Sequence, residues 1–461
     1  MAASDQTKYI CSSAMSLPFY VNVGLVVDDV LDASILRDKY AQLVELWPIL
    51  GGKLLSKFDM RRFQCGRTVD FRERTIKKDL SWFLPFSWHP GAAPRVICDD
   101  LVHIDGKFLF AAPLISTSTS KLRVTTLNDA TLLCFSFSHG LCDGQSAYDI
   151  IRYFCDLLSD KPIPKFTFPP DATGKRISDL IQEVTTEPLS AQLERDIFVS
   201  NPLAAVKFFA RYLPFILAET LRLSPKLTHR TIYLPGTWVD SVRARAQKEL
   251  EVRGEYLGLQ LTKNDLIAAL YLKLVYGAKK PNYSNNPVDY IGPINYRPLL
   301  KPSGLDTYYT HNSITCLLCQ FSEHELRTES ITKIAARIRL ATIQYRHPAS
   351  IKREISRFED KVLAPAMQDS HASVKWGLPM VSPWTTFNYT ALDFSGASRQ
   401  GRKPSIVFAN PSVPLALGTL LSPFAINLKD GAGGYWLRGA NTQHGWEVFE
   451  QLTSMDNLFH S

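Results

Sequence analysis

A histidine that directly follows a hydrophobic strand pattern is the residue in this sequence best suited to acid–base chemistry. Residues 131–138, Thr-Leu-Leu-Cys-Phe-Ser-Phe-Ser, are β-prone and run straight into His139 and Gly140. Histidine takes up and releases a proton near neutral pH, and catalytic groups concentrate in loops and at strand ends. His139 is therefore a candidate general base.

The residues after His139 strengthen this interpretation. Asp143 follows four positions later, and Gly140 and Gly144 allow the backbone to turn tightly beside a ligand. The result is a His-x-x-x-Asp-Gly pattern, placed between a hydrophobic strand and a helix-prone segment that begins near Asp143 or Ser146. A lone histidine is more often a structural residue, and that alternative stays open at this point.

The first part of the chain mixes strand and helix patterns. Residues 20–27 read as a strand, and Asp32 offers an N-cap to a helix whose apolar positions recur at helical spacing as far as Trp47. Further expected elements are strands at 95–104 and 108–114 and a helix at 146–158. The mixture predicts a layered α/β or α+β domain.

The length of 461 residues favours two domains with a cleft between them. Four prolines within residues 160–170 end the first domain, because proline continues neither a helix nor a central strand. We expect an N-terminal domain at 1–165, a helix-rich crossover linker at 166–227 and a C-terminal domain at 228–461. The expected elements of the C-terminal domain are strands at 230–234 and 314–321, helices at 238–250, 263–276 and 328–346, and an irregular stretch near 297.

Charge and composition exclude several classes of protein. Hydrophobic residues make up 45% and charged residues 21% of the chain, as in globular proteins. The net charge of +8 is a mild excess, and no basic stripe is interleaved with aromatics, so we expect no nucleic acid partner. The excess is compatible with a nucleotide-like ligand.

Cysteine usage and hydropathy indicate a cytoplasmic protein. The eight cysteines are scattered through a long chain, which is typical of a reducing compartment. Cys316 and Cys319 lie in an apolar run without further metal ligands, so we expect a buried strand and no metal site. The N-terminus does not resemble a secretory signal, and the apolar residues 202–223 carry charges that favour an amphipathic helix over a membrane span.

Together these patterns resemble the BAHD family of CoA-dependent acyltransferases, within the chloramphenicol-acetyltransferase-like superfamily. The resemblance spans nearly the whole chain. Besides the His139 motif, it is carried by residues 36–55, by residues 262–273, and by Asn295-Tyr-Arg-Pro298 with His311-Asn312 downstream. It implies an α/β (α+β) fold of two similar domains, each a mixed sheet flanked by helices, with the active-site channel at their interface.

The second motif of the family, Asp-Phe-Gly-Trp-Gly, is degenerate in this chain. The matching position reads Asp393-Phe394-Ser395-Gly396-Ala397, with Trp384 nine residues before Asp393. This departure is similar to that of fungal members from secondary metabolism. The resemblance gives Asp393 a structural role, away from the acyl-transfer centre.

The resemblance also implies roles for the remaining site residues. His139, Asp143 and Ser382 are the catalytic candidates, with His139 as the base and the Ser382 hydroxyl as a donor to the oxyanion. In similar proteins the carboxylate matching Asp143 pairs with the arginine matching Arg297, which makes that pair structural. Gly144 belongs to the same structural group.

Two basic segments are candidate CoA contacts. Thr262 as an N-cap followed by Lys263 forms a helix start suited to an anion. Arg402 and Lys403 follow the degenerate motif, although such a run is usually a solvated loop. Acetyl-CoA or another acyl-CoA would be a co-substrate, and no cofactor would be permanently bound.

The function that the resemblance implies is O-acyl transfer, most simply O-acetyl transfer, from acyl-CoA to a hydroxyl. The expected acceptor is a hydrophobic natural product such as a terpenoid, meroterpenoid or polyketide. The enzyme is expected to be a monomer without stable membrane insertion, and to work by direct general-base attack on the thioester.

Three alternatives remain at this stage. A serine hydrolase needs a Gly-x-Ser-x-Gly elbow, which the segment from Gly144 to Tyr148 fails to complete. A condensation domain of peptide synthesis carries two adjacent histidines, whereas Ser138 precedes His139 here. A superfamily member without CoA chemistry, either a condensation- or cyclase-like enzyme or a non-catalytic binding protein, is the third.

Overall fold

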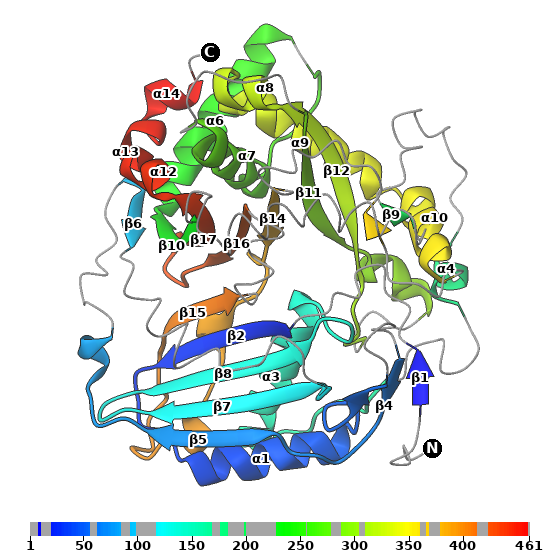
Figure 1. Ribbon diagram of the computed structural model, residues 1–461, viewed down its shortest axis with the longest axis vertical. Helices are drawn as coiled ribbons and strands as arrows, with labels where there is room; N and C mark the ends of the chain where they lie inside the picture. The colour runs from blue at the N-terminus through cyan, green and yellow to red at the C-terminus, as the bar shows by residue number, and fades with distance from the viewer. Residues whose placement is uncertain are drawn as a thin grey trace, which may run out of the picture.

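The computed structural model describes most of the chain in two layered regions (Figure 1). The described residues are 8–10, 20–55, 62–83, 93–97, 117–167, 176–182, 198–199, 227–254, 256–277, 287–303, 309–359, 366–367, 379–412 and 423–459. The expected helix at 202–223 and the expected strand at 108–114 lie outside them. Within the described residues, no helix has both the length and the apolar character needed to cross a bilayer.

The lower region is a mixed sheet covered on one face by two helices (Figure 1). Its strand order is β15 (Ile406–Ser412), β2 (Tyr20–Val27), β8 (Thr131–Ser138), β7 (Ser120–Thr126) and β5 (Phe71–Thr75). Helices α1 (Ala33–Leu46) and α3 (Gly144–Leu158) pack on the face to which the odd-numbered residues of β8 point. The Phe135 ring, for example, lies 5.4 Å from the Phe154 ring of α3. The other face of this sheet carries the even-numbered residues of β8, because side chains alternate along a strand.

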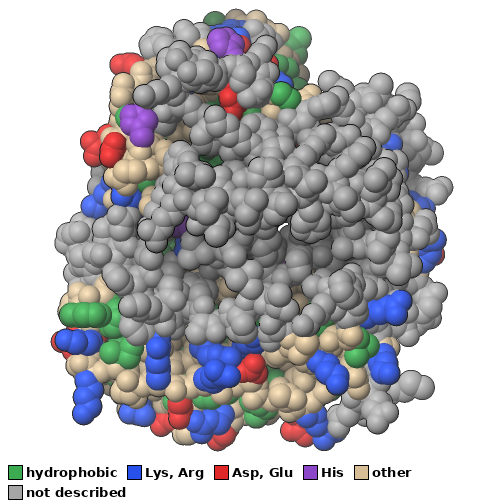
Figure 2. Space-filling view, viewed as in Figure 1, with side chains coloured by type: hydrophobic (Ala, Val, Ile, Leu, Met, Phe, Trp, Pro, Cys, Tyr) green, Lys and Arg blue, Asp and Glu red, His purple; other side chains and the backbone are tan. Residues whose placement is uncertain are grey.

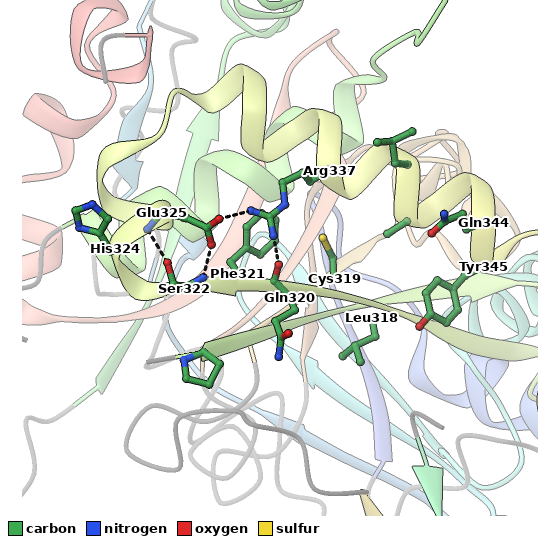
Figure 3. Close-up of a pocket in the computed structure, with 13 residues that line it drawn as sticks. Leu318, Cys319, Gln320, Phe321, Ser322, His324, Glu325, Arg337, Gln344 and Tyr345 are labelled. Atoms are coloured by element: carbon green, nitrogen blue, oxygen red, sulfur yellow. Dashed lines mark hydrogen bonds and ion pairs between the residues drawn. The ribbon is translucent and has the colours of Figure 1, made fainter. Parts of the chain in front are cut away.

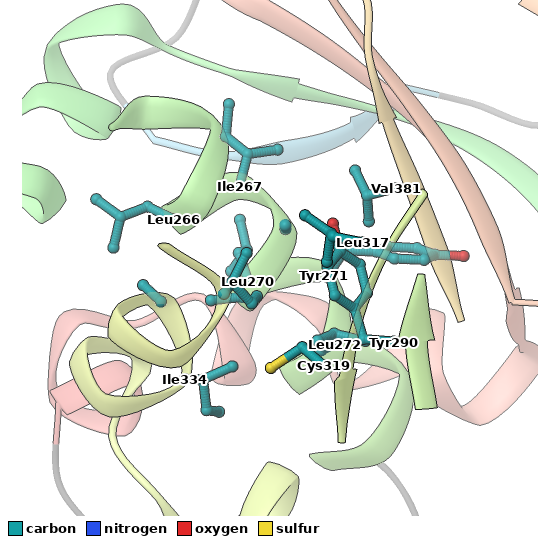
Figure 4. Packing of buried hydrophobic residues seen from close by; sticks show 14 of the residues in the cluster. Leu266, Ile267, Leu270, Tyr271, Leu272, Tyr290, Leu317, Cys319, Ile334 and Val381 are labelled. Atoms are coloured by element: carbon teal, nitrogen blue, oxygen red, sulfur yellow. The ribbon is translucent and has the colours of Figure 1, made fainter. Parts of the chain in front are cut away.

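The upper region is a second sheet with helices packed against it. Its strand order is β12 (Ile314–Ser322), β11 (Pro287–Asn295), β14 (Met380–Pro383), β16 (Phe424–Lys429), β17 (Tyr435–Thr442), β10 (Leu227–Leu234) and β6 (Arg95–Ile97). The main helices are α6 (Gly236–Arg253), α7 (Lys263–Gly277), α8 (Glu323–Thr328), α9 (Ile331–Tyr345) and α10 (Pro348–Glu359). Helix α7 is buried from Asp265 to Tyr276, and Figure 4 shows its apolar side chains packed among those of β11, β12, β14 and α9. A helix that is apolar all round belongs inside a core.

Two strands join the sheet of the opposite half of the chain. β6 comes from the N-terminal half and pairs with β10, whereas β15 comes from the C-terminal half and pairs with β2 (Figure 1). Each exchange adds backbone hydrogen bonds between distant parts of the chain. The two regions are therefore tied together by one exchanged strand from each half of the chain.

Smaller elements complete the described fold. They are strands β1 (Lys8–Ile10), β3 (Lys53–Leu54), β4 (Arg62–Gln64), β9 (Phe198–Val199) and β13 (Ala366–Met367), helices α4 (Ile177–Leu180), α12 (Gln443–Glu447), α13 (Phe449–Leu452) and α14 (Met455–Phe459), and 3-10 turns at Leu80–Trp82, Arg297–Ser303, Tyr389–Ala391 and Ser395–Ala397.

Local capping explains where the helices start. Asp32 caps α1 by accepting hydrogen bonds from the backbone of Ser34 and Ile35, as the sequence predicts. Helix α3 begins at Gly144, two residues earlier than expected, because Asp143 is its N-cap. The helix expected at 328–346 is present as α9, which begins at Ile331 because Ser330 is its N-cap; the short helix α8 before it was not expected.

Exposed charge is mixed over the visible surface. Figure 2 shows Lys and Arg side chains gathered along the lower part of that face, where the N-terminal sheet and α1 lie, with acidic side chains between them. Interspersed charges of both signs are typical of an ordinary solvated surface.

Candidate active site

His139 lies in a tight turn at the end of β8. The backbone N–H groups of Leu141 and Cys142 both donate to the carbonyl of Ser138, over 2.9 Å each. The turn is held from the C-terminal half, because the N–H of Asn312 donates to the carbonyl of Leu141 over 2.7 Å. The imidazole therefore stands where the two halves of the chain meet, and it keeps part of its surface exposed.

The surroundings of His139 favour its neutral form. Burial lowers the pKa of His139 below its ordinary value of 6.5, although a hydrogen bond to its own backbone carbonyl and the Asp143 charge act in the opposite direction. The ring N–H that donates to this carbonyl leaves the other ring nitrogen with its lone pair. At neutral pH the side chain is ready to accept a proton.

Asn312 fixes the orientation of His139. Its side-chain Nδ2 donates to the backbone carbonyl of His139 over 2.8 Å and lies 3.3 Å from the imidazole Nδ1. Asn312 itself is only 1% exposed. Sequence reasoning matched Asn312 to a family element but gave it no role, and no local pattern links it to a histidine 173 positions away.

Asp143 makes an ion pair with Arg297 and does not form a triad with His139. Arg297 Nη1 lies 2.9 Å from Asp143 Oδ2, and Nη2 donates to Oδ1 over 3.0 Å. The backbone N–H groups of Ser146 and Ser313 also donate to the carboxylate, over 2.9 and 2.7 Å. Burial alone would raise the pKa of Asp143, but Arg297 and these hydrogen bonds hold it below its ordinary value.

Arg297 bonds several segments together. Its Nε donates to the carbonyl of Tyr309 over 2.9 Å, and its Nη2 donates to the Ser146 hydroxyl over 2.6 Å and to the carbonyl of His311. The guanidinium is 5% exposed. It thus fastens the start of α3 to the segment that carries Asn312.

Gly144 is required by packing against an aromatic ring. A methyl group at this position would lie 2.5 Å from the ring of Trp384. The Trp384 Nε1 donates to the hydroxyl oxygen of Ser382 over 3.0 Å, which leaves the Ser382 O–H group available as a donor. Gly144, which lies five residues after His139, therefore allows Trp384 and its partner Ser382 to pack beside the start of α3.

Comparison with known proteins identifies the family. No family model matches the chain. Its sequence is 38% identical to acetyltransferase peniE of Penicillium patulum over 464 aligned positions, covering 95% of this chain and 96% of that protein. The chain belongs to the BAHD family of CoA-dependent acyltransferases.

Solved structures agree with this fold. F. graminearum TRI101 in complex with coenzyme A and T-2 mycotoxin matches with a TM-score of 0.68, 11% identity and 98% of each chain covered. Vinorine synthase matches with a TM-score of 0.63 and 12% identity, over 98% of this chain and 94% of its own. The predicted mixed α/β fold with two layered regions is confirmed.

Of the residues expected to contact CoA in this BAHD acyltransferase, Thr262 and Lys263 lie near the segment that carries Ser382 and Trp384. The Thr262 hydroxyl donates to Asp265 over 2.7 Å, and Lys263 Nζ lies 2.7 Å from Asp240. The next residue, Asn264, accepts hydrogen bonds from Thr385 over 3.2 Å and from Asn427 over 3.1 Å. The start of α7 is thereby placed beside the residue that follows Trp384.

Arg402 and Lys403 lie elsewhere in the acyltransferase. Arg402 Nη1 is 3.4 Å from Asp28, directly after β2, and Lys403 is exposed. The end of β2 pairs with Thr131 at the start of β8, eight residues before His139. At about 3.3 Å per residue this is a separation of about 26 Å. The structure does not bring these two residues to the His139 turn.

The degenerate motif is also remote from His139. Asp393 accepts a hydrogen bond from the backbone of Ser395 over 2.9 Å. A side chain at Gly396 would overlap the carbonyl of Leu158, so the motif packs against the C-terminal end of α3. Since α3 rises by about 1.5 Å per residue, Asp393 lies at the opposite end of this helix from the His139 turn.

A cavity of about 990 Å³ between β12 and α9 is separate from His139, Asp143 and Ser382 (Figure 3). Its lining includes Cys319, Glu325 and Arg337, and not His139. The Glu325 carboxylate lies 2.8 Å from Arg337, and both residues of this ion pair line the cavity. Cys316 and Cys319 are buried on the strand that the sequence predicts.

Proposed function

We propose that this acyltransferase moves an acetyl group from acetyl-CoA to a hydroxyl of a hydrophobic natural product such as a terpenoid, meroterpenoid or polyketide. The observation that carries the proposal is the desolvated, neutral imidazole of His139, oriented by Asn312 and still reachable. Support comes from the relative named as an acetyltransferase and from the complex of TRI101 with coenzyme A and T-2 mycotoxin.

His139 would act as the general base in the first step. Its unprotonated ring nitrogen takes the proton of the acceptor hydroxyl while the alcohol oxygen forms a bond to the thioester carbonyl carbon. The C–S bond then breaks, and the departing thiolate takes the proton back from His139 to leave as free CoA. A thioester is already activated, so no covalent enzyme intermediate is needed, and a positioned base contributes about 10²- to 10⁴-fold.

Ser382 would stabilise the charge on the tetrahedral intermediate. Its hydroxyl accepts a hydrogen bond from Trp384 and retains its own proton for a donor role. A donor placed at a developing oxyanion contributes about 3 to 4 kcal/mol in other enzymes.

Asp143 and Arg297 would act as positioning residues. Their ion pair commits the carboxylate to Arg297, Ser146 and Ser313, so it holds the His139 turn against the C-terminal half and does not transfer protons. Within the proposed domains 1–165 and 228–461, joined by the linker 166–227, His139 and Asn312 come from different domains. Because one chain supplies all of these groups, we also propose that the enzyme is a monomer. The scattered cysteines are the reason for proposing that it works in the cytoplasm.

The proposal is tested by CoA release from acetyl-CoA with a panel of terpenoid and polyketide alcohols, comparing the wild type with His139→Ala. We expect turnover in the wild type and a loss of about 10²- to 10⁴-fold in a folded variant. Equal rates, or no binding of acetyl-CoA, would favour the superfamily member without CoA chemistry.

The pH profile gives a second readout of the same residue. Because burial lowers the pKa of His139 below its ordinary value of 6.5, the base form predominates at pH 7, and kcat/KM should fall as the pH drops below 6.5. A rise in kcat/KM across pH 7 to 8 would contradict the assignment of His139 as the base.

A further inference from the structure

The face of the N-terminal sheet opposite α1 and α3 carries a row of buried polar side chains. In the strand register, Ser412 of β15 lies beside Asn22 of β2, Asn22 beside Ser136 of β8, and Ser136 beside Lys121 of β7. We call Asn22, Ser136 and Lys121, which are 1%, 1% and 2% exposed, the Lys121 row. A sheet face that only packs against a core would be apolar here.

Lys121 is a buried cation without an ion-pair partner among the described residues. Its Nζ lies 4.4 Å above the Tyr20 ring, and in the part of the chain that the structure describes it makes neither an ion pair nor a hydrogen bond. The nearby carboxylate, Asp70, is bonded to Arg123 at 2.8 Å. Burial of an unpaired charge costs several kcal/mol, so an ammonium is retained in such a place when something else binds it.

Asn22 and Ser136 also have hydrogen-bonding capacity that the described residues leave unused. Asn22 Oδ1 is buried and has no hydrogen-bond partner in the described parts of the chain. Among the described residues, the Ser136 hydroxyl has only the weak contact to Cys134 Sγ at 3.7 Å. Three neighbouring polar groups that do not satisfy one another are a second, independent sign of a missing ligand.

The row includes Ser136 of β8, the strand that ends at the His139 turn. Ser136 and His139 lie on the same strand and the turn after it, three residues apart, which is about 10 Å. Tyr20, whose ring contacts Lys121, pairs with Ser138, the residue before His139. A molecule with a hydroxyl at His139 and a second oxygen function about 10 Å away would reach both.

We propose that Lys121, Asn22 and Ser136 form an acceptor subsite that binds an ionised oxygen of the acceptor, in the first instance a carboxylate, about 10 Å from the hydroxyl that is acylated. This rests on the proposed acyl transfer and narrows its acceptor to an alcohol that carries a carboxylate. Lys121 supplies the charge, and the Asn22 amide and Ser136 hydroxyl supply hydrogen bonds.

The electrostatic state of Lys121 agrees with this role. Burial lowers the pKa of Lys121 to about 8, while Asp70 raises it and Arg123 and Arg72 lower it further. The ammonium is still the main form at pH 7, and a bound carboxylate would hold it protonated.

The test uses two rigid hydroxy acids that differ by one ring, 4-(hydroxymethyl)benzoic acid and 4'-(hydroxymethyl)biphenyl-4-carboxylic acid, each beside its methyl ester. Acetyl transfer from acetyl-CoA and equilibrium binding in the presence of CoA are both measured. The variants are Lys121→Met, which keeps the length of the side chain without its charge, and Lys429→Met, a matched change of an exposed lysine on β16.

We expect the wild type and Lys429→Met to prefer the longer acid over its ester, and Lys121→Met to lose that preference by about tenfold or more with the ester unaffected. Lys121→Met should melt at or above the wild-type temperature, because it removes an unpaired buried charge. No preference for the acid in the wild type, an unchanged preference in Lys121→Met, or a lower melting temperature of that variant would each overturn the subsite. Preferential binding of the acid without acetyl transfer to any alcohol would overturn the proposed function and leave the subsite standing.

Discussion

The Asp143–Arg297 pair and the Lys121 row both lie beside β8, but they differ in how completely their polar groups are bonded. In the His139 junction, which comprises His139 to Ser146 with Arg297 and Asn312, the Asp143 carboxylate alone receives bonds from three residues. In the Lys121 row, the Lys121 ammonium and the Asn22 amide oxygen are buried to a similar extent. Among the described residues, neither has a hydrogen-bond or ion-pair partner.

This difference separates positioning from binding. The Asp143–Arg297 ion pair with its hydrogen bonds is a satisfied and rigid network, because moving either residue breaks several hydrogen bonds in a medium of low dielectric constant. Unsatisfied groups keep their bonding capacity for a ligand, at a cost in stability that the folded protein has to bear. Changes in the His139 junction should therefore affect folding and rate, whereas changes in the Lys121 row should affect the choice of acceptor.

The largest expected effect comes from breaking the ion pair of the His139 junction. Asp143→Ala leaves the Arg297 charge buried and should lower the free energy of unfolding by about 3 to 5 kcal/mol, measured by urea denaturation. Because the pKa of Asp143 is lowered by folding, its contribution is present above its unfolded pKa of 3.8. That contribution disappears as the pH falls through the folded pKa, so the difference between wild type and variant should shrink in acid.

The matched control for this change is a double variant, Asp143→Ala with Arg297→Met, which removes both charges. It should recover part of the lost stability, since no charge is left without a partner. Equal stability of the wild type and Asp143→Ala would show that the junction is not held by this pair.

The next effect concerns Ser382, which is linked to the junction because its partner Trp384 packs against Gly144. Ser382→Ala should lower kcat by about 10²- to 10³-fold with little change in melting temperature. Ser382→Thr keeps a hydroxyl and should retain most of the activity. A Ser382→Ala enzyme with wild-type kcat would remove Ser382 from the mechanism and leave it as a partner of Trp384 only.

The smallest expected effect is on the KM for acetyl-CoA, and it distinguishes the two candidate CoA contacts. Lys263→Ala should raise the KM for acetyl-CoA by about fivefold, equivalent to about 1 kcal/mol at a helix N-terminus. Arg402→Ala should leave this KM within about twofold, because Arg402 is bound to Asp28, far from the His139 turn. The reverse order of effects would place the CoA phosphates on the Arg402 loop.

Local sequence patterns were sufficient for much of the fold. The strand at 131–138 and the start of α7 at Lys263 coincide with their expected positions, since alternation and helical spacing are properties of neighbouring residues. The short helix α8 was missed, and the helix expected from residue 328 begins at Ile331, because one capping serine decides that boundary. Strand β11 was missed because its burial on both faces removes the alternating pattern.

The candidate site was predictable only in part, for the same reason. The motif from His139 to Gly144 is a local signal, and the family resemblance added Arg297 and Ser382 to it. Nothing local distinguishes Lys121 from the many other lysines in the chain, and its burial became visible only when β7 took its place beside β8.

The sequence by itself determined the strand that ends at His139, the capping aspartate at 143 and the glycine that follows, because each depends on residues within one or two turns of the chain. The tertiary structure alone decided that Asn312 orients His139, that β15 completes the N-terminal sheet, and that Lys121, Asn22 and Ser136 lie in one row. These contacts join residues up to hundreds of positions apart. Their energies come from burial and from hydrogen bonds that exist only after the chain has folded.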